Sequence, residues 1–130
     1  GSLALAKGTI RDRARTNSVI DAGPGGLVSL LECLVERYGR ISCNAATVSI
    51  DRTALRDMSL VGLQMTGGSL TAVRSTVCDG TVTQGIDGVR LGGGSRAILT
   101  NCMLDNLTGS GLKLTGSSDS ALLAASLVFG

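Results

Sequence analysis

The sequence predicts an all-β solenoid of short parallel strands, and three observations lead to this fold. A motif recurs along the chain, equivalent positions in its copies carry similar apolar residues, and aromatic residues are scarce. Aromatic residues make up 2% of the 130 residues, whereas apolar residues make up 43%. An interior built mainly from Leu, Val, Ile, Ala and Thr is thin and regular, which suits coils that bury their side chains only against neighbouring coils.

The repeated motif has a recognisable internal order. Each copy begins with a short alternating strand, followed by a two-residue bend, a second short strand, a variable loop and a strand introduced by glycine. A weaker copy over residues 3–10 precedes the clear ones. The clear copies start at Val28, Val48, Thr71, Ala97 and Ser120, which gives spacings of 20, 23, 26 and 23 residues.

Stacked coils place equivalent side chains in rows, because neighbouring strands lie roughly 4.8 Å apart. We expect bulky rings to disturb such rows, which explains the scarcity of aromatic residues. The predicted inward rows are Leu30, Ile50, Val73, Leu99 and Leu122; Cys33, Thr53, Thr76, Cys102 and Ala125; Val35, Leu55, Cys78, Leu104 and Leu127; and Ile41, Leu63, Val89 and Leu112.

This pattern resembles the right-handed parallel β-helix repeat of the pectin-lyase-like family. The resemblance covers residues 46–127 well and residues 3–45 less well, and it implies five to six short coils. We expect residues 1–130 to form a single β-helix domain, as a fragment of a longer chain. The family includes polysaccharide lyases and hydrolases, phage tailspikes, adhesins and catalytically silent modules, and it is mostly secreted or displayed at the cell surface.

Residues 19–39 fit a second interpretation. Residues 19–26 read as a strand and a glycine turn, and Leu27, Leu30, Leu31, Leu34 and Tyr38 follow at helical spacing. The segment resembles the nucleotide-binding loop of Rossmann-type methyltransferases, in which backbone amides at a helix N-terminus meet the cofactor. The open alternatives are coil strands, one helix inserted at the N-terminal end of the solenoid, or a nucleotide-binding α/β domain.

The family resemblance directs attention to the outward face of the glycine-led strand, where its enzymes carry out catalysis. The outward residues there are Ser42, Gln64, Arg90 and Lys113, and none is a carboxylate. A glycoside hydrolase needs two acidic groups at the bond it cleaves. We therefore expect a non-catalytic structural or binding module, in which Gln64, Arg90 and Lys113 could contact a polysaccharide.

The alternative function is a polysaccharide lyase or hydrolase fragment. Its candidate catalytic residues are Arg90, Lys113, Asp79 and Asp105. The two aspartates follow the second strand of successive copies, so their carboxylates are expected to be neighbours. Glu36 and Arg56 are expected in the same row, and a ladder of alternating charges is the simpler interpretation of that row.

An apolar stripe is predicted on the outside of the second strand, at Leu34, Ala54, Val77 and Met103. Apolar side chains in a row that should face water mark a contact surface. The last copy, which starts at Ser120, is not followed by a polar cap, and an uncapped coil exposes backbone groups and apolar side chains. We expect self-association or contact with neighbouring domains of a longer chain.

Composition excludes several classes of function. The chain has no His and no closely spaced Cys pairs, which leaves no zinc-type site, and we expect no cofactor. Its net charge of +2 makes no case for nucleic acid, and no apolar run reaches the ~18 residues of a membrane helix. The four cysteines lie among apolar residues and are expected to be buried free thiols, which argues against secretion.

Overall fold

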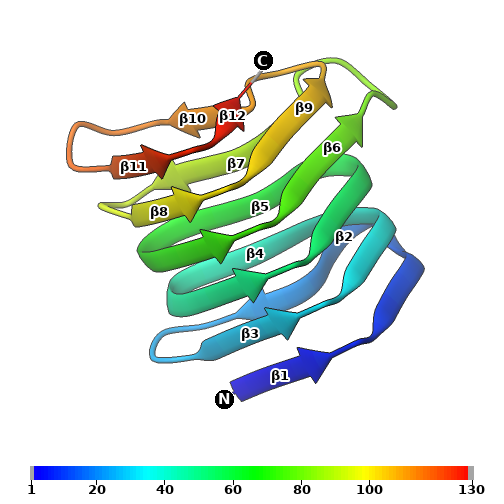
Figure 1. Cartoon of the computed structure of the whole chain (residues 1–130), viewed down its shortest axis with the longest axis horizontal. Coiled ribbons are helices and arrows are strands. Elements are labelled where there is room, and N and C mark those ends of the chain that lie inside the picture. Colours follow the sequence, from blue (N-terminus) through cyan, green and yellow to red (C-terminus); the bar gives the residue numbers. More distant parts are fainter. Residues whose placement is uncertain (1, 129–130) are drawn as a thin grey trace.

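The computed structural model describes residues 2–128 of the chain, and every regular element in that range is a β-strand (Figure 1). All strands pair in parallel within one continuous sheet that winds into a solenoid of about five turns. The strands are β1 (Ser2–Ala6), β2 (Thr9–Ala22), β3 (Leu27–Leu31), β4 (Leu34–Asp51), β5 (Ala54–Val73), β6 (Thr76–Gly80), β7 (Asp87–Gly92), β8 (Arg96–Thr100), β9 (Met103–Leu107), β10 (Leu112–Leu114), β11 (Ser120–Ala124) and β12 (Leu127–Val128). The predicted all-β solenoid is therefore confirmed.

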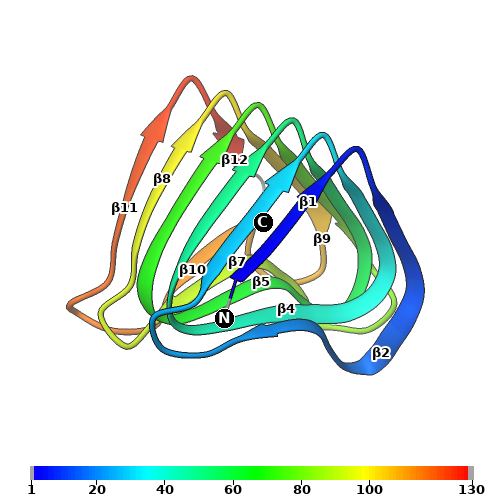
Figure 2. The same cartoon turned by 90° about the horizontal axis from the view of Figure 1, so that it is seen from below.

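The solenoid has three sides (Figure 2). The first side contains β1, β3, β8 and β11 together with the C-terminal parts of β4 and β5. The second side contains β6, β9 and β12 together with the N-terminal parts of β2, β4 and β5. The third side is formed by the end of β2, the middle of β4 and β5, β7 and β10. Seen from the N-terminal end, the chain runs clockwise as it recedes, so the coils are right-handed (Figure 2).

The bend between the first and second sides is the same in six successive coils. One residue in each coil has a left-handed backbone with φ between 48° and 55°, a conformation uncommon for residues with side chains. The next residue, in five of these coils, donates its hydroxyl or thiol to the carbonyl two positions earlier, which satisfies an acceptor at the bend. The left-handed residues are Lys7, Glu32, Arg52, Arg74, Asn101 and Ala125, and the donors are Cys33, Thr53, Ser75, Cys102 and Ser126.

The predicted rows are correct in three coils and displaced by one residue in two. The glycine-led row of Ile41, Leu63, Val89 and Leu112 is confirmed. In the coil of Thr71 and in the last coil, however, the inward residues are Ala72, Ser75 and Val77, and Leu123, Ser126 and Val128. The predicted Val73, Thr76 and Cys78, and Leu122, Ala125 and Leu127, are each one position away. The bend decides the register, because Ser75 and Ser126 supply the hydroxyl that the bend uses.

The corner between the second and third sides holds the largest core residues. Tyr38 is completely buried there with Met58, Ile86 and Leu107, so the expectation that a ring would disturb the rows is wrong at this corner. Gly80 leaves room for the side chains of Met58, Ile86 and Leu107, because a Cβ at position 80 would lie 2.6–2.8 Å from their atoms. The buried Tyr38 hydroxyl donates to the carbonyl of Gly62 at 2.9 Å.

Residues 19–39 are coil strands, and the helix predicted as an alternative is absent from residues 2–128. Side-chain burial in β3 alternates, with Leu27 exposed and Val28 and Leu30 buried, which is the period of a strand. The glycine segment before it forms a turn in which the N–H of Gly26 donates to the carbonyl of Gly23. The nucleotide-binding interpretation loses the helix on which it depended. None of the described segments is a helix long and apolar enough to cross a membrane.

Candidate binding surfaces

The outward row on the third side contains the predicted binding residues. Gln64, Arg90 and Lys113 lie in register with one another, as expected. Arg90 is already engaged, because its Nε and Nη2 donate to Asp87 at 2.9 and 2.8 Å. The other oxygen of Asp87 accepts the N–H of Ser110 at 2.8 Å. The Asp87 carboxylate therefore links Arg90 to the next coil, and the Arg90 guanidinium is already paired.

The structure does not bring Asp79 and Asp105 to equivalent positions. Asp105 lies in register with Cys78, and Asp79 lies one residue further along. The neighbour of Asp79 in the next coil is Asn106, whose Nδ2 donates to Asp79 Oδ1 at 2.8 Å. The expected carboxylate pair was wrong because it rested on the displaced register of this coil.

The apolar outer stripe is shorter than predicted. Leu34, Ala54 and Met103 occupy one outward row, and Met103 is 40% exposed. Val77 points into the core and is only 3% exposed, so its assignment to the stripe was wrong. Thr76 takes the outward position, and its hydroxyl interrupts the apolar row.

A cluster of arginines that the sequence prediction missed covers the second side in its first three coils. It is formed by Arg11, Arg15, Arg37 and Arg56, which come from β2 and the first parts of β4 and β5 and share ion pairs with three carboxylates. We call these residues the arginine cluster. Because the strands are in parallel register, side chains 20 to 25 positions apart in sequence become neighbours across coils.

Glu36 lies at the centre of the arginine cluster. It is in register with Arg11 on one side and Arg56 on the other, and its carboxylate lies 2.9 Å from Arg11 Nη2 and 3.5 Å from Arg56 Nε. Arg37 Nη1 is 3.7 Å away. The Glu36 side chain is 10% exposed, whereas these three arginine side chains are 41–52% exposed. The carboxylate therefore lies beneath a layer of guanidinium groups.

Two further carboxylates hold the edge of the arginine cluster. Nε and Nη2 of Arg37 donate to the two oxygens of Asp12, and these hydrogen bonds keep the pKa of Asp12 below its usual range. The chain has extra residues between Arg13 and Ser18, and this bulge brings Arg15 to Asp57 in the third coil. Arg15 Nη1 donates to the Asp57 carbonyl at 3.2 Å.

The charges of this surface do not cancel. Four arginines face the three carboxylates of Asp12, Glu36 and Asp57, which leaves an excess of one positive charge. The net charge of the chain is +2, so all other residues together carry a net charge of +1. Guanidinium groups are therefore gathered on one side of the N-terminal half. The run of alternating arginines over residues 11–15 is the sequence signal that could have indicated it.

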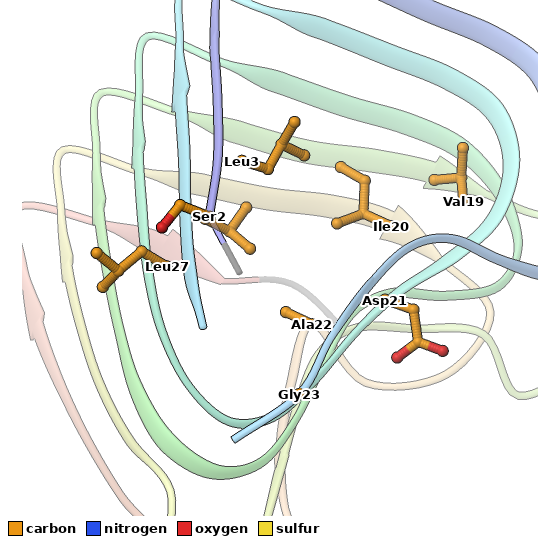
Figure 3. A pocket seen from close by; sticks show the side chains of 9 residues that line it. Ser2, Leu3, Val19, Ile20, Asp21, Ala22, Gly23 and Leu27 are labelled. Carbon is orange, nitrogen blue, oxygen red and sulfur yellow. The ribbon is translucent and has the colours of Figure 1, made fainter. Parts of the chain in front are cut away.

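A hollow of about 410 Å³ lies at the N-terminal end of the solenoid, between β1 and the end of β2 (Figure 3). Leu3, Val19, Ile20 and Ala22 supply most of its apolar lining. The Asp21 carboxylate points away from Leu3 and Ile20, toward the outside of the strand (Figure 3).

The acidic side chains and thiols do not converge on a shared ion site. Within residues 2–128, no group of three or more Cys, Asp or Glu side chains is placed to hold a metal ion. All four cysteines are free thiols, as expected, but only Cys33, Cys43 and Cys102 are buried, and Cys78 is partly exposed. Comparison of the chain with protein-family models, with curated proteins and with solved structures found no match.

Proposed function

We propose that this protein is a non-catalytic binding module that holds an acidic polysaccharide on its arginine cluster. The observation that carries the proposal is the gathering of four half-exposed arginines on one side of the solenoid, where they outnumber the three carboxylates that they contact. Guanidinium groups bind carboxylate and sulfate groups through paired hydrogen bonds, and the ligand class follows from that chemistry.

The cluster is organised before any ligand arrives. Glu36 and Asp12 fix the orientation of Arg11, Arg37 and Arg56 through ion pairs and hydrogen bonds. The strands beneath are paired on both sides from the second coil onward, so the backbone that carries the guanidinium groups is rigid. A prearranged site loses less side-chain entropy when it binds.

An extended acidic polysaccharide fits this surface better than a nucleic acid does. Proteins bind single-stranded nucleic acid by stacking bases on exposed aromatic side chains. The only tyrosine, Tyr38, is completely buried, and Phe129 lies outside the described residues. A polysaccharide with regularly repeated carboxylate or sulfate groups needs only cations at a regular spacing, and Arg11 and Arg56 stand two coils apart, at roughly twice the 4.8 Å strand spacing.

Structural roles of the carboxylates support the non-catalytic part of the proposal. Asp87 binds Arg90 and the N–H of Ser110. Asp119 accepts the N–H groups of Gly94, Ser95 and Gly116 at 2.7–2.9 Å. These carboxylates stabilise turns of the third side, where the resemblance would place an active site.

The test compares two double variants with the same change in net charge. Arg11→Ser with Arg56→Ser removes two cations from the arginine cluster, and Arg74→Ser with Arg96→Ser removes two exposed cations elsewhere. Binding of heparin and polygalacturonate is measured by calorimetry at low salt and at 0.15 M salt. We expect the cluster variant to bind at least about tenfold more weakly, equivalent to roughly 1.4 kcal/mol, and the control to bind like the natural chain.

Three outcomes would contradict the proposal. Equal loss in both double variants would mean that net charge, and not the cluster, governs binding. If a single-stranded DNA of matched charge binds more tightly than the polysaccharides, the ligand is a nucleic acid and not a polysaccharide. Depolymerisation of polygalacturonate that stops in an Arg90→Ala variant would favour the lyase alternative.

A further inference from the structure

A groove of about 660 Å³ runs across four coils at the bend between the first and second sides. Each coil contributes its left-handed bend residue and the outward residue two positions later, and the bends of successive coils form one row (Figure 2). The groove therefore follows the solenoid axis. The bend residues on one side of it are Lys7, Glu32, Arg52 and Arg74, and the strand residues on the other side are Thr9, Leu34, Ala54 and Thr76.

The arginine cluster borders this groove. Side chains two positions apart in a strand face the same way, so Arg11, Glu36 and Arg56 lie beside the strand residues of the groove. The four bend residues, Asp51 and the arginine cluster with its three carboxylates comprise seven cations and five carboxylates. Their excess of two positive charges equals the net charge of the chain, and all other residues sum to zero. The groove and its border therefore favour an anionic occupant.

The charges along the groove alternate from coil to coil. Both borders are basic in the first coil, acidic in the second and basic again in the third, so an anionic group is attracted at the first and third coils and repelled at the second. The two basic positions stand two coils apart, at roughly twice the 4.8 Å strand spacing. The residues on the bend side are Lys7, Glu32 and Arg52, and those on the strand side are Arg11, Glu36 and Arg56.

The guanidinium group of the third coil is accessible to a ligand. Arg52 lies 3.8 Å from Glu32 and 3.5 Å from Asp51, both beyond the ~3.2 Å of an ordinary N–H···O hydrogen bond, and its side chain is 51% exposed. Arg74 in the fourth coil differs, because its Nε and Nη2 donate to the Asp51 carboxylate at 2.9–3.2 Å. The groove therefore offers more guanidinium donors in the third coil than in the fourth.

We propose that this groove binds a polysaccharide that carries an acidic group on every second sugar, with the acidic groups at the first and third coils. The inference rests on the proposed function and names the kind of acidic polysaccharide. A sugar unit of an extended glycan is about as long as one strand spacing, so alternate sugars meet alternate coils. The uncharged sugar lies at the second coil, where its hydroxyl or amide groups donate to Glu32, whose side chain is 39% exposed.

An extended polypeptide fits this groove less well than a polysaccharide. Peptides that bind along a sheet gain affinity from main-chain hydrogen bonds to an open strand edge. The backbone beneath the groove is already paired from coil to coil, since the N–H of Leu34 donates to the carbonyl of Gly8 and the N–H of Ala54 to that of Cys33, each at 3.0 Å. A polysaccharide needs only the side-chain contacts that the groove provides.

The experiment compares two polysaccharides that differ in the spacing of their carboxylates. Hyaluronate carries a carboxylate on every second sugar, and polygalacturonate carries one on every sugar. Binding of fragments with the same number of sugars is measured by calorimetry at 0.15 M salt. We expect hyaluronate to bind at least about tenfold more tightly, although its fragments carry half the charge. Binding governed by charge alone gives the opposite order.

Two pairs of variants locate the ligand in the groove. Glu32→Gln should tighten polygalacturonate binding about fivefold or more and change hyaluronate binding less, because it removes the repulsion at the second coil. Asp21→Asn makes the same change in net charge on the third side and should leave the ratio of the two affinities unchanged. Arg52→Ser should weaken hyaluronate binding about tenfold, whereas Arg96→Ser should not. Circular dichroism and urea denaturation show that each variant is folded.

The outcomes separate this inference from the proposed function. Polygalacturonate that binds as tightly as hyaluronate or more tightly, with loss of binding in Arg11→Ser with Arg56→Ser, would overturn the alternate spacing and leave the proposed function standing. An affinity ratio that Glu32→Gln does not move, or hyaluronate binding that Arg52→Ser does not weaken, would remove the ligand from the groove. Failure of the natural chain to bind either polysaccharide would overturn the proposed function together with the inference.

Discussion

Tyr38 offers a direct test of the core, because the structure buries its ring and hydroxyl completely. The Tyr38→Phe substitution keeps the ring and removes the hydrogen bond from the hydroxyl to the Gly62 carbonyl, which is 2.9 Å long. A buried acceptor that loses a partner costs about 1–3 kcal/mol. We expect the free energy of unfolding at pH 7 to fall by that amount, because the solenoid otherwise keeps its packing.

The same residue predicts how stability depends on pH. Burial raises the pKa of Tyr38 well above the ordinary 10.0, because the core disfavours the charged tyrosinate. The unfolded chain releases this proton near pH 10, whereas the folded chain keeps it. Its contribution to stability is therefore complete below pH 10 and is lost as the pH rises from 10 toward the folded-state pKa. Tyr38→Phe lacks this loss, so the stability difference between the two proteins should shrink in alkali.

Ultraviolet absorbance measures this titration without a label. The chain has one Tyr and no Trp, so the tyrosinate signal comes from Tyr38 alone. Urea denaturation at pH 7 compares the two proteins, and an alkaline titration follows absorbance together with circular dichroism. We expect tyrosinate to form only as the strands unfold. A midpoint near pH 10 with intact strands would refute the burial of Tyr38 and the arrangement of its corner.

Three further predictions test the coil packing, the thiols and the arginine cluster. Gly62→Ala should lower the stability by about 1–3 kcal/mol or more, because its Cβ would lie 2.3 Å from the Gly88 carbonyl oxygen. Gly23→Ala, with no atom within 4 Å of the new Cβ, should change the melting temperature little, and equal shifts would contradict the close approach of the coils. Cys43 should react with a thiol reagent at pH 8 only on unfolding, since burial raises its pKa to about 11; rapid labelling detected by mass spectrometry in the folded protein would refute this. Glu36→Gln should lower the melting temperature and tighten heparin binding, because it removes a carboxylate from beneath the arginines; weaker heparin binding would contradict this account of the cluster.

Much of the fold follows from local sequence pattern. In a solenoid each residue packs against its equivalents in the adjacent coils, so rows such as Ile41, Leu63, Val89 and Leu112 are visible as a period in the sequence. The helix predicted as an alternative for residues 19–39 was wrong because leucines at helical spacing also satisfy a strand when Leu27 and Leu34 face outward. The local pattern does not distinguish a helix from a strand in this segment, and the pairing with the neighbouring coils decides between them.

The candidate site was harder to predict than the fold. Gln64, Arg90 and Lys113 were placed correctly in one row, but the pairing of Arg90 with Asp87 depends on a turn whose shape the sequence does not reveal. The arginine cluster also depends on the bulge that brings Arg15 to the third coil. Charged residues tolerate many positions on a surface, so their spacing carries less information than that of core residues.

The sequence by itself determined the all-β class, the repeat and most of the inward rows, because burial requires apolar residues at a regular period. Only the tertiary structure decided which of two adjacent residues faces the core where both are apolar or small, as at Val77 and Cys78 or at Leu122 and Leu123. The bend settles that choice, since Ser75 and Ser126 must reach a carbonyl at the turn. Whether a ring such as Tyr38 fits also depends on how its corner is filled, and the sequence does not show that its neighbour Met58 packs in turn against Gly80 of another coil.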